Sequence, residues 1–132
     1  MLIKVADERL GATDEATHDD GAVLYSSRVR TLVDAVYDWS RFDSLPRGYE
    51  WIRREIAAKR VSALELIKAT LCYGDTGTIR RMGALLEGGR VDSALLRKLS
   101  RVLKPTSSFI PWIPARPRRG TLNRRWGIVF NE

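Results

Sequence analysis

Residues 61–89, VSALELIKATLCYGDTGTIRRMGALLEGG, decide the fold because they contain two helices with explicit start and stop signals. Ser62-Ala63-Leu64-Glu65 has the pattern of a capping box, in which a serine and a glutamate three residues later satisfy each other's backbone N–H groups. Val61 can pack on Leu66 across this cap as a hydrophobic staple. The first helix should therefore run to about Tyr73 and stop at the glycine that follows.

The second helix of this stretch begins at Asp75 or Thr76, either of which can cap it, and closes at Gly88-Gly89. Its apolar residues recur at helical spacing and should face the core: Ile79, Met82, Leu85 and Leu86. Gly83 lies in the middle of this helix, where a glycine costs about 1 kcal/mol relative to alanine. Such a residue indicates close contact with a neighbouring helix.

Three further helices are expected between residues 26 and 104. The sequence places their starts after Ser26 or Ser27, at Ser44 with Pro46 in the first turn, and after Asp92. The last of these helices should turn four apolar side chains inward, at Leu96, Leu99, Val102 and Leu103.

The tail, residues 105–132, is expected to be extended because a proline ends the last helix. Phe109–Ile113 contains Pro111, which cannot donate to a central ladder, so this segment should be an edge strand. Trp126–Phe130 has no proline and can lie further inside, with Gly120 in the connecting loop of a β-hairpin. The expected fold is α+β, with four or five helices packed with a small antiparallel sheet that contains this C-terminal hairpin.

Residues 1–21 are the least organised part of the sequence. This segment is polar and acidic and is broken by glycines, which predicts a flexible arm in which Leu2–Val5 can form a short strand. Residues 22–132 should form the single domain, starting with a short strand at Ala22–Tyr25. His18 has no second histidine or cysteine nearby, so we do not expect a metal site in the arm.

Positive charge is concentrated in the second and third parts of the chain. The net charge of +7 divides into −3 for residues 1–48, +6 for residues 49–104 and +4 for residues 105–132. A basic field attracts nucleic acid, an acidic protein or a phosphate-bearing ligand, and charge alone does not choose among them.

The sequence has no apolar run of roughly 18–20 residues, the length of a membrane span. The lone cysteine, Cys72, fits a small core residue in a reducing compartment, so we expect a cytoplasmic protein without membrane contact.

A catalytic centre is not apparent in the sequence. A Ser/His/Asp or Cys/His mechanism needs a histidine, and the chain has one, in the acidic arm. A glycine-rich phosphate loop with its lysine is also missing. Asp34 and Asp38, one helical turn apart, can share a proton or a metal, or they can pair with Arg30 and Arg41. We favour the ion pairs and expect a binding protein without cofactor or metal rather than an enzyme.

Three stretches of the sequence carry a resemblance to a known family. Residues 27–34, SRVRTLVD, are similar to a Ser-Pro-Glu-Arg-Thr-Leu-Leu-Asp segment of that family, with matches at Arg30, Thr31, Leu32 and Asp34. Residues 73–87 are similar to a family helix with an Arg-(apolar)-Gly core and a closing Leu-Glu, matched by Arg81, Met82, Gly83, Leu86 and Glu87. The tail resembles the closing strands of the family at Pro114, Gly120, Asn123, Trp126 and Asn131. In this order and separation, the stretches resemble the C-terminal antitoxin domain of AbiEi-type (abortive-infection E) toxin–antitoxin proteins.

The resemblance implies that residues 22–132 form an AbiEi-like antitoxin domain. Such a domain neutralises a cognate nucleotidyltransferase-like toxin in abortive infection, which is a phage-defence response. The chain departs from the family pattern where Arg28 and Val29 replace Pro-Glu. Only 26 residues precede the first stretch, so we expect the antitoxin domain without the N-terminal winged helix that many family members carry.

The arginines of the tail are the residues that we expect to bind a partner. No acid lies between residues 105 and 131, and the planar guanidinium group can hold two oxygens of a carboxylate or phosphate at once. The predicted surface consists of Arg118, Arg119, Arg124 and Arg125, joined by Arg80 and Arg81.

Two alternatives accompany this prediction. Arg30 and Asp34 are a second candidate site, although a structural ion pair at one helical turn explains them as well. The alternative function is a basic nucleic-acid-binding protein, in transcriptional regulation or RNA binding, that uses the arginine-rich hairpin. A purely structural or assembly role is a third class.

Overall fold

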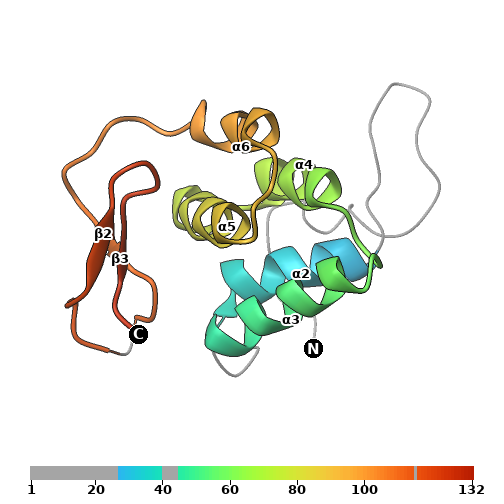
Figure 1. Cartoon of the computed structure of the whole chain (residues 1–132), viewed down its shortest axis with the longest axis horizontal. Helices are drawn as coiled ribbons and strands as arrows, with labels where there is room; N and C mark the ends of the chain where they lie inside the picture. Colours follow the sequence, from blue (N-terminus) through green and yellow to red (C-terminus); the bar gives the residue numbers. More distant parts are fainter. Residues whose placement is uncertain (1–26, 40–44, 115) are drawn as a thin grey trace.

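The computed structural model describes residues 27–39, 45–114 and 116–132, which are coloured in Figure 1. Within these residues five helices precede three short strands: α2 (Ser27–Tyr37), α3 (Leu45–Ala57), α4 (Ala63–Tyr73), α5 (Thr76–Gly88), α6 (Ser93–Ser100), β1 (Ile110–Pro111), β2 (Thr121–Asn123) and β3 (Ile128–Phe130). The fold is therefore α+β, as expected. The predictions for the arm of residues 1–21, which include Leu2–Val5 and His18, lie outside the described residues. The same holds for those on Ala22–Tyr25, Ser26, Arg41 and Ser44.

The start and stop signals act as the sequence predicts. The Ser62 hydroxyl accepts a hydrogen bond from the Glu65 backbone N–H at 3.1 Å, and the Glu65 carboxylate accepts one from the Ser62 N–H at 3.0 Å. This reciprocal pair is the capping box, and α4 ends at Tyr73. The Asp75 carboxylate caps α5 by accepting a hydrogen bond from the Thr78 N–H at 2.8 Å, and Asp92 caps α6 in the same manner.

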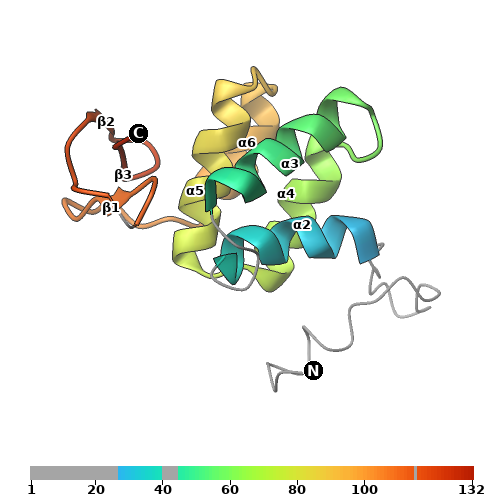
Figure 2. The same cartoon turned by 90° about the horizontal axis from the view of Figure 1, so that it is seen from below.

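Helix α5 is the element that joins the helices to the sheet. It packs against α2, α4 and α6, and it also contacts β3. Figures 1 and 2 show it between the other helices and the strands. The core contains fully buried side chains from every described helix, among them Leu32, Ile52, Leu66, Met82 and Leu99.

The sheet is mixed rather than purely antiparallel, and this corrects the predicted topology. Its strand order is β1-β3-β2, so β3 is the central strand and β1 an edge strand, as the position of Pro111 predicts. β1 pairs with β3 in parallel, whereas β2 pairs with β3 antiparallel. The hairpin therefore consists of β2 and β3, and the two apolar segments that the sequence suggested as hairpin partners run in the same direction.

Hydrogen bonding explains how a proline fits beside the central strand. The N–H groups of Ile110 and Trp112 donate to the carbonyls of Gly127 and Val129 at 2.9 and 2.8 Å. Pro111 lies between these donors, at the position whose nitrogen faces away from β3, so its missing N–H leaves the ladder intact. Strand β2 runs opposite to β1 and lies on the other side of β3.

Two tryptophans, Trp112 and Trp126, attach the tail to the helices, and both are buried. The ring of Trp112 stacks on Tyr49 of α3, with centroids 3.7 Å apart and planes 12° apart. The Tyr49 hydroxyl also donates a hydrogen bond to the Trp112 carbonyl at 2.9 Å, and burial raises the pKa of Tyr49 well above its ordinary value.

The second tryptophan, Trp126, packs against α5 at Gly83. A Cβ atom on Gly83 would lie 2.6 Å from Cδ2 of Trp126 and closer still to Cε3 and Cζ3. The glycine is therefore required for a close contact, but its neighbour is an indole of the tail and not a helix as predicted. Trp126 is 1% exposed as a result.

Asn131 holds the connection between β1 and β2 in place. Its side-chain oxygen accepts a hydrogen bond from the Ile113 N–H at 2.8 Å, and its amide nitrogen donates to the Ile113 carbonyl at 2.8 Å. The same nitrogen also lies 3.2 Å from the Arg116 carbonyl and 3.1 Å from that of Pro117. The side chain is buried, so one amide fixes a segment without regular secondary structure.

Two predictions about burial are wrong. Val102 is 54% exposed because α6 ends at Ser100, so Val102 follows in a turn and leaves the inward stripe of the helix. Cys72 is exposed as well. It lies one residue before the end of α4 and is not among the buried residues of this helix, which are Leu66, Ile67, Ala69, Thr70 and Tyr73.

An ion-pair network around Glu55 links α2, α3 and the segment after α3. The Glu55 carboxylate accepts hydrogen bonds from Arg60 at 2.6 and 2.8 Å, and Arg28 of α2 lies 3.4 Å from its other oxygen. The hydrogen bond from Arg60 lowers the pKa of Glu55, against the opposing effect of burial, and the charges of Arg60 and Arg28 add to this.

We expect the substitution Gly83→Ala to lower the free energy of unfolding by about 1–3 kcal/mol, because the added methyl group displaces Trp126. Gly88→Ala is the matched control in the same helix, since nothing lies within 4 Å of its Cβ position. The control should keep or slightly raise stability, as alanine favours helix. Urea unfolding of both variants measures the difference, and equal stabilities would contradict the contact.

Stability should also depend on pH through Glu55. Its folded pKa is depressed, so the stabilisation is present above the unfolded value of about 4.3 and is lost as the pH falls through the folded value. We expect wild type to lose more unfolding free energy than Glu55→Gln between pH 6 and pH 3, in urea titrations at each pH. An identical loss in both proteins would show that the Glu55 network does not contribute.

Candidate anion-binding site

A hollow of about 190 Å³ lies where the segment after α6 passes the turn between β2 and β3. We call it the cationic hollow, and its lining includes Arg80, Lys104, Thr106, Arg124, Arg125 and Trp126. No carboxylate of the described residues lines it. The four cations come from three separate segments, namely α5, the chain that follows α6, and the β2–β3 turn.

Arg80 reaches the hollow from α5. Its guanidinium group donates to the Ser108 carbonyl at 3.2 Å, which holds it beside the segment that leads into β1. The backbone of Gly127 passes close to this group, since a Cβ there would lie 3.3 Å from Cζ of Arg80. Gly127 also has φ of 66°, in the left-handed region that favours glycine. The turn can therefore pack closely against Arg80 without strain.

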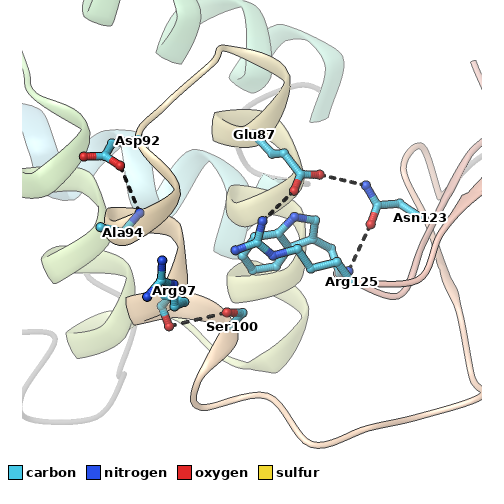
Figure 3. Close-up of polar contacts among 8 residues, drawn as sticks. Glu87, Asp92, Ala94, Arg97, Ser100, Asn123 and Arg125 are labelled. Carbon is cyan, nitrogen blue, oxygen red and sulfur yellow. Dashed lines mark hydrogen bonds and ion pairs between the residues drawn. The ribbon is translucent and has the colours of Figure 1, made fainter.

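Glu87 of α5 fixes the turn that carries Arg124 and Arg125. One carboxylate oxygen accepts a hydrogen bond from the Asn123 amide at 3.0 Å, and the other forms an ion pair with Arg125 at 2.9 Å. Figure 3 shows Glu87 between these two residues. The Asn123 side chain in turn accepts a hydrogen bond from the Trp126 N–H at 3.2 Å. Both ends of the turn are therefore held on α5 before any ligand arrives.

The four cations of the hollow differ in whether they already form an ion pair with an acid of the described residues. Arg125 pairs with Glu87, and its Cζ lies 5.0 Å from the ring centroid of Trp126. Arg80 donates only to a carbonyl, and neither Lys104 nor Arg124 forms an ion pair with any acid that the structure describes. Three positive charges are thus available to an external anion.

The four tail arginines predicted as one surface form two separate pairs. Arg124 and Arg125 follow β2 directly, at the end of the sheet where Asn123 pairs with Ile128. Arg118 and Arg119 precede β2, at the end where Thr121 pairs with Phe130. Arg118 extends back along the sheet to the Phe109 carbonyl at 3.5 Å, and both side chains are exposed.

Arg81 binds the tail. Its Nε and Nη2 atoms donate to the Pro111 carbonyl at 3.2 and 2.8 Å, so it anchors β1 on α5. Burial lowers the pKa of Arg81 from its ordinary value, against the opposing influence of Tyr49 and Asp75. A half-buried guanidinium group with these partners has a structural role.

Arg30 and Asp34 form the ion pair predicted at one helical turn, at 3.7 Å. The Arg30 guanidinium group also lies over the ring of Tyr73, 5.3 Å from its centroid, and burial lowers the pKa of Arg30. These contacts join α2 to the end of α4. Neither residue lines the cationic hollow.

Lys104 and Glu87 are the two residues of the site whose roles the sequence did not reveal. Lys104 is one of many basic residues between positions 49 and 104, and only its position directly before Pro105 places it in the connection to the tail. Glu87 appeared as a matched residue of the second stretch. The absence of acids in the tail suggested unpaired arginines, but an acid from α5 supplies the missing charge.

A second hollow, of about 400 Å³, lies beside α3 and is lined by Arg28, Thr31, Trp51, Glu55 and Arg60. Both of its cations already pair with Glu55, at 3.4 and 2.6 Å. It therefore offers less free charge than the cationic hollow, and we regard the latter as the better site for an anionic partner.

We expect Arg81→Ala to lower the free energy of unfolding by about 1.5–3 kcal/mol, the range for hydrogen bonds that involve a charged group. Arg119→Ala, which removes an exposed arginine, should change stability by no more than about 0.5 kcal/mol. Thermal unfolding of the two variants at equal protein concentration separates structural from free arginines. A more destabilising Arg119→Ala would contradict this assignment.

Other kinds of site find little support in residues 27–39, 45–114 and 116–132. No three His, Cys, Asp or Glu side chains of this part gather as a metal site requires. None of its helices combines the length and apolar character needed to cross a membrane. Comparison of the chain with protein-family models, curated proteins and solved structures found no match.

Proposed function

We propose that this protein is an antitoxin-type binding protein that neutralises a cognate nucleotidyltransferase-like toxin in the cytoplasm. The observation that carries the proposal is that residues of the second and third matched stretches contact one another. Gly83 and Glu87 of the second stretch contact Trp126 and Asn123 of the tail, and Arg81 anchors β1. A resemblance spread over distant stretches of sequence is more specific when the matched residues contact one another in the structure.

The contacts between α5 and the tail also indicate what the matched residues do. These residues hold the tail on α5, so they account for a shared architecture, and we infer that other residues contact the partner. The exposed cations near these contacts are suited to this role, because they can bind carboxylates or phosphates of a partner without disturbing the core. Neutralisation would then be a binding event that needs no catalytic group in this chain.

Nucleic-acid binding is the second candidate function, and the cationic hollow favours it. Arg80, Lys104 and Arg124 place three charges around a concave surface without an acid that pairs with them among the described residues. Phosphate contacts of this kind provide affinity that does not depend on base sequence.

Co-expression tests the antitoxin proposal. We expect cells that produce a nucleotidyltransferase-like toxin encoded beside this gene to resume growth when the protein is induced, measured as colony counts and growth rate. An allele with an early stop codon controls for the effect of transcription. If growth stays fully arrested while an immunoblot shows abundant soluble protein, the antitoxin proposal is wrong.

A further inference from the structure

We propose that the cationic hollow is a binding site for a phosphate ester, the group that nucleotides and polynucleotides share. This inference goes beyond neutralisation of a toxin. It rests on the second candidate function, nucleic-acid binding, and gives that candidate a defined place and a ligand chemistry.

The origin of the cations in three separate segments favours phosphate over carboxylate. Arg80 lies on α5, Lys104 in the segment after α6, and Arg124 in the β2–β3 turn, and all three line the hollow. Several cations around one hollow suit a tetrahedral group with several charged oxygens, whereas a carboxylate presents two oxygens in one plane and is satisfied by one guanidinium fork. A phosphate monoester also carries nearly two negative charges at neutral pH.

A neutral donor is present beside the cations. The Thr106 hydroxyl accepts a hydrogen bond from the Ser108 N–H at 3.0 Å, so its own hydrogen can donate to a ligand. A phosphate oxygen is an acceptor for such a donor, whereas an aliphatic or cationic ligand would leave it unsatisfied. Trp126 also lines the hollow, but its indole N–H is buried and therefore not accessible to a ligand.

The size of the hollow limits which part of the ligand it holds. Its volume of about 190 Å³ is below the range of roughly 300–1,000 Å³ that encloses a drug-sized molecule. A phosphate with part of its sugar fits, and the rest of the ligand must extend into solvent. Trp126 is buried and Arg125 lies over its ring, so this ring offers no free face on which a base could stack. Recognition should therefore be independent of base identity.

Fluorescence anisotropy with the full chain and a labelled single-stranded DNA of fifteen nucleotides tests the site. We compare two double variants that each remove two positive charges. Lys104→Ala/Arg124→Ala alters the cationic hollow, whereas Arg118→Ala/Arg119→Ala alters the other end of the sheet. We expect the first variant to weaken binding about tenfold and to reduce the log–log salt slope by about one, and the second to change affinity less than threefold.

A variant that is expected to bind DNA more tightly provides a second test. Glu87→Gln removes the carboxylate that pairs with Arg125 but keeps an oxygen that can accept from Asn123. It should raise affinity about two- to fivefold, the size of one partly exposed ion pair. Melting curves of all variants verify that each is folded, so a loss of binding cannot be mistaken for unfolding.

Each outcome decides the proposal. Inorganic phosphate or a mononucleotide that displaces the DNA at millimolar concentration supports a terminal phosphate as ligand, whereas competition by unlabelled DNA alone supports a backbone phosphodiester. Equal losses in the two double variants would overturn the site and leave nucleic-acid binding in place. No binding to DNA at 25 mM salt would overturn both, and neither result bears on neutralisation of a toxin.

Discussion

The contact between Trp126 and Gly83 is the constraint on which the position of the tail depends. A large indole can approach the backbone of α5 only where no side chain intervenes, and a glycine in mid-helix provides that surface at a cost of about 1 kcal/mol in helix propensity. Because Trp126 is fixed there, the turn before it lies beside Arg80 and Glu87 of the same helix. The hydrogen bonds of Glu87 then hold this turn, and the central strand β3 continues from it into the core.

Arginines perform two different tasks in this protein. Arg30 and Arg81 are partly buried, have their pKa lowered by burial, and bind an aromatic ring, a carboxylate or a carbonyl of the fold. Arg118, Arg119 and Arg124 are exposed. Among the described residues, Arg118 has one long hydrogen bond, at 3.5 Å to the Phe109 carbonyl, and the side chains of Arg119 and Arg124 have none. A high net charge is therefore not a measure of binding capacity, since part of it serves packing, and only the geometry separates the two groups.

Local structure could be predicted from the sequence better than topology. The start of α4 follows from Ser62 and Glu65, because a capping box is a contact between neighbours. The direction of β1 relative to β3 could not be predicted, because two apolar segments pair equally well in either sense and β2 is a short strand with an exposed Leu122. The site was only partly predictable, because some of its residues come together only through contacts between distant parts of the chain. Arg124 and Arg125 were found from local charge, but Glu87 and Lys104 reach the site through the fold.

The contacts that hold the tail connect residues far apart along the chain. Tyr49 and Trp112 are separated by 63 positions, and Glu87 and Arg125 by 38. Closing such long loops costs entropy before the contact stabilises the chain, so helices joined by short connections should assemble first and the tail should dock last. The cationic hollow takes its sides from both parts and exists only after docking. Hydrogen exchange of the β3 amides would thus report the fraction of molecules competent to bind an anion, even where the helices remain protected.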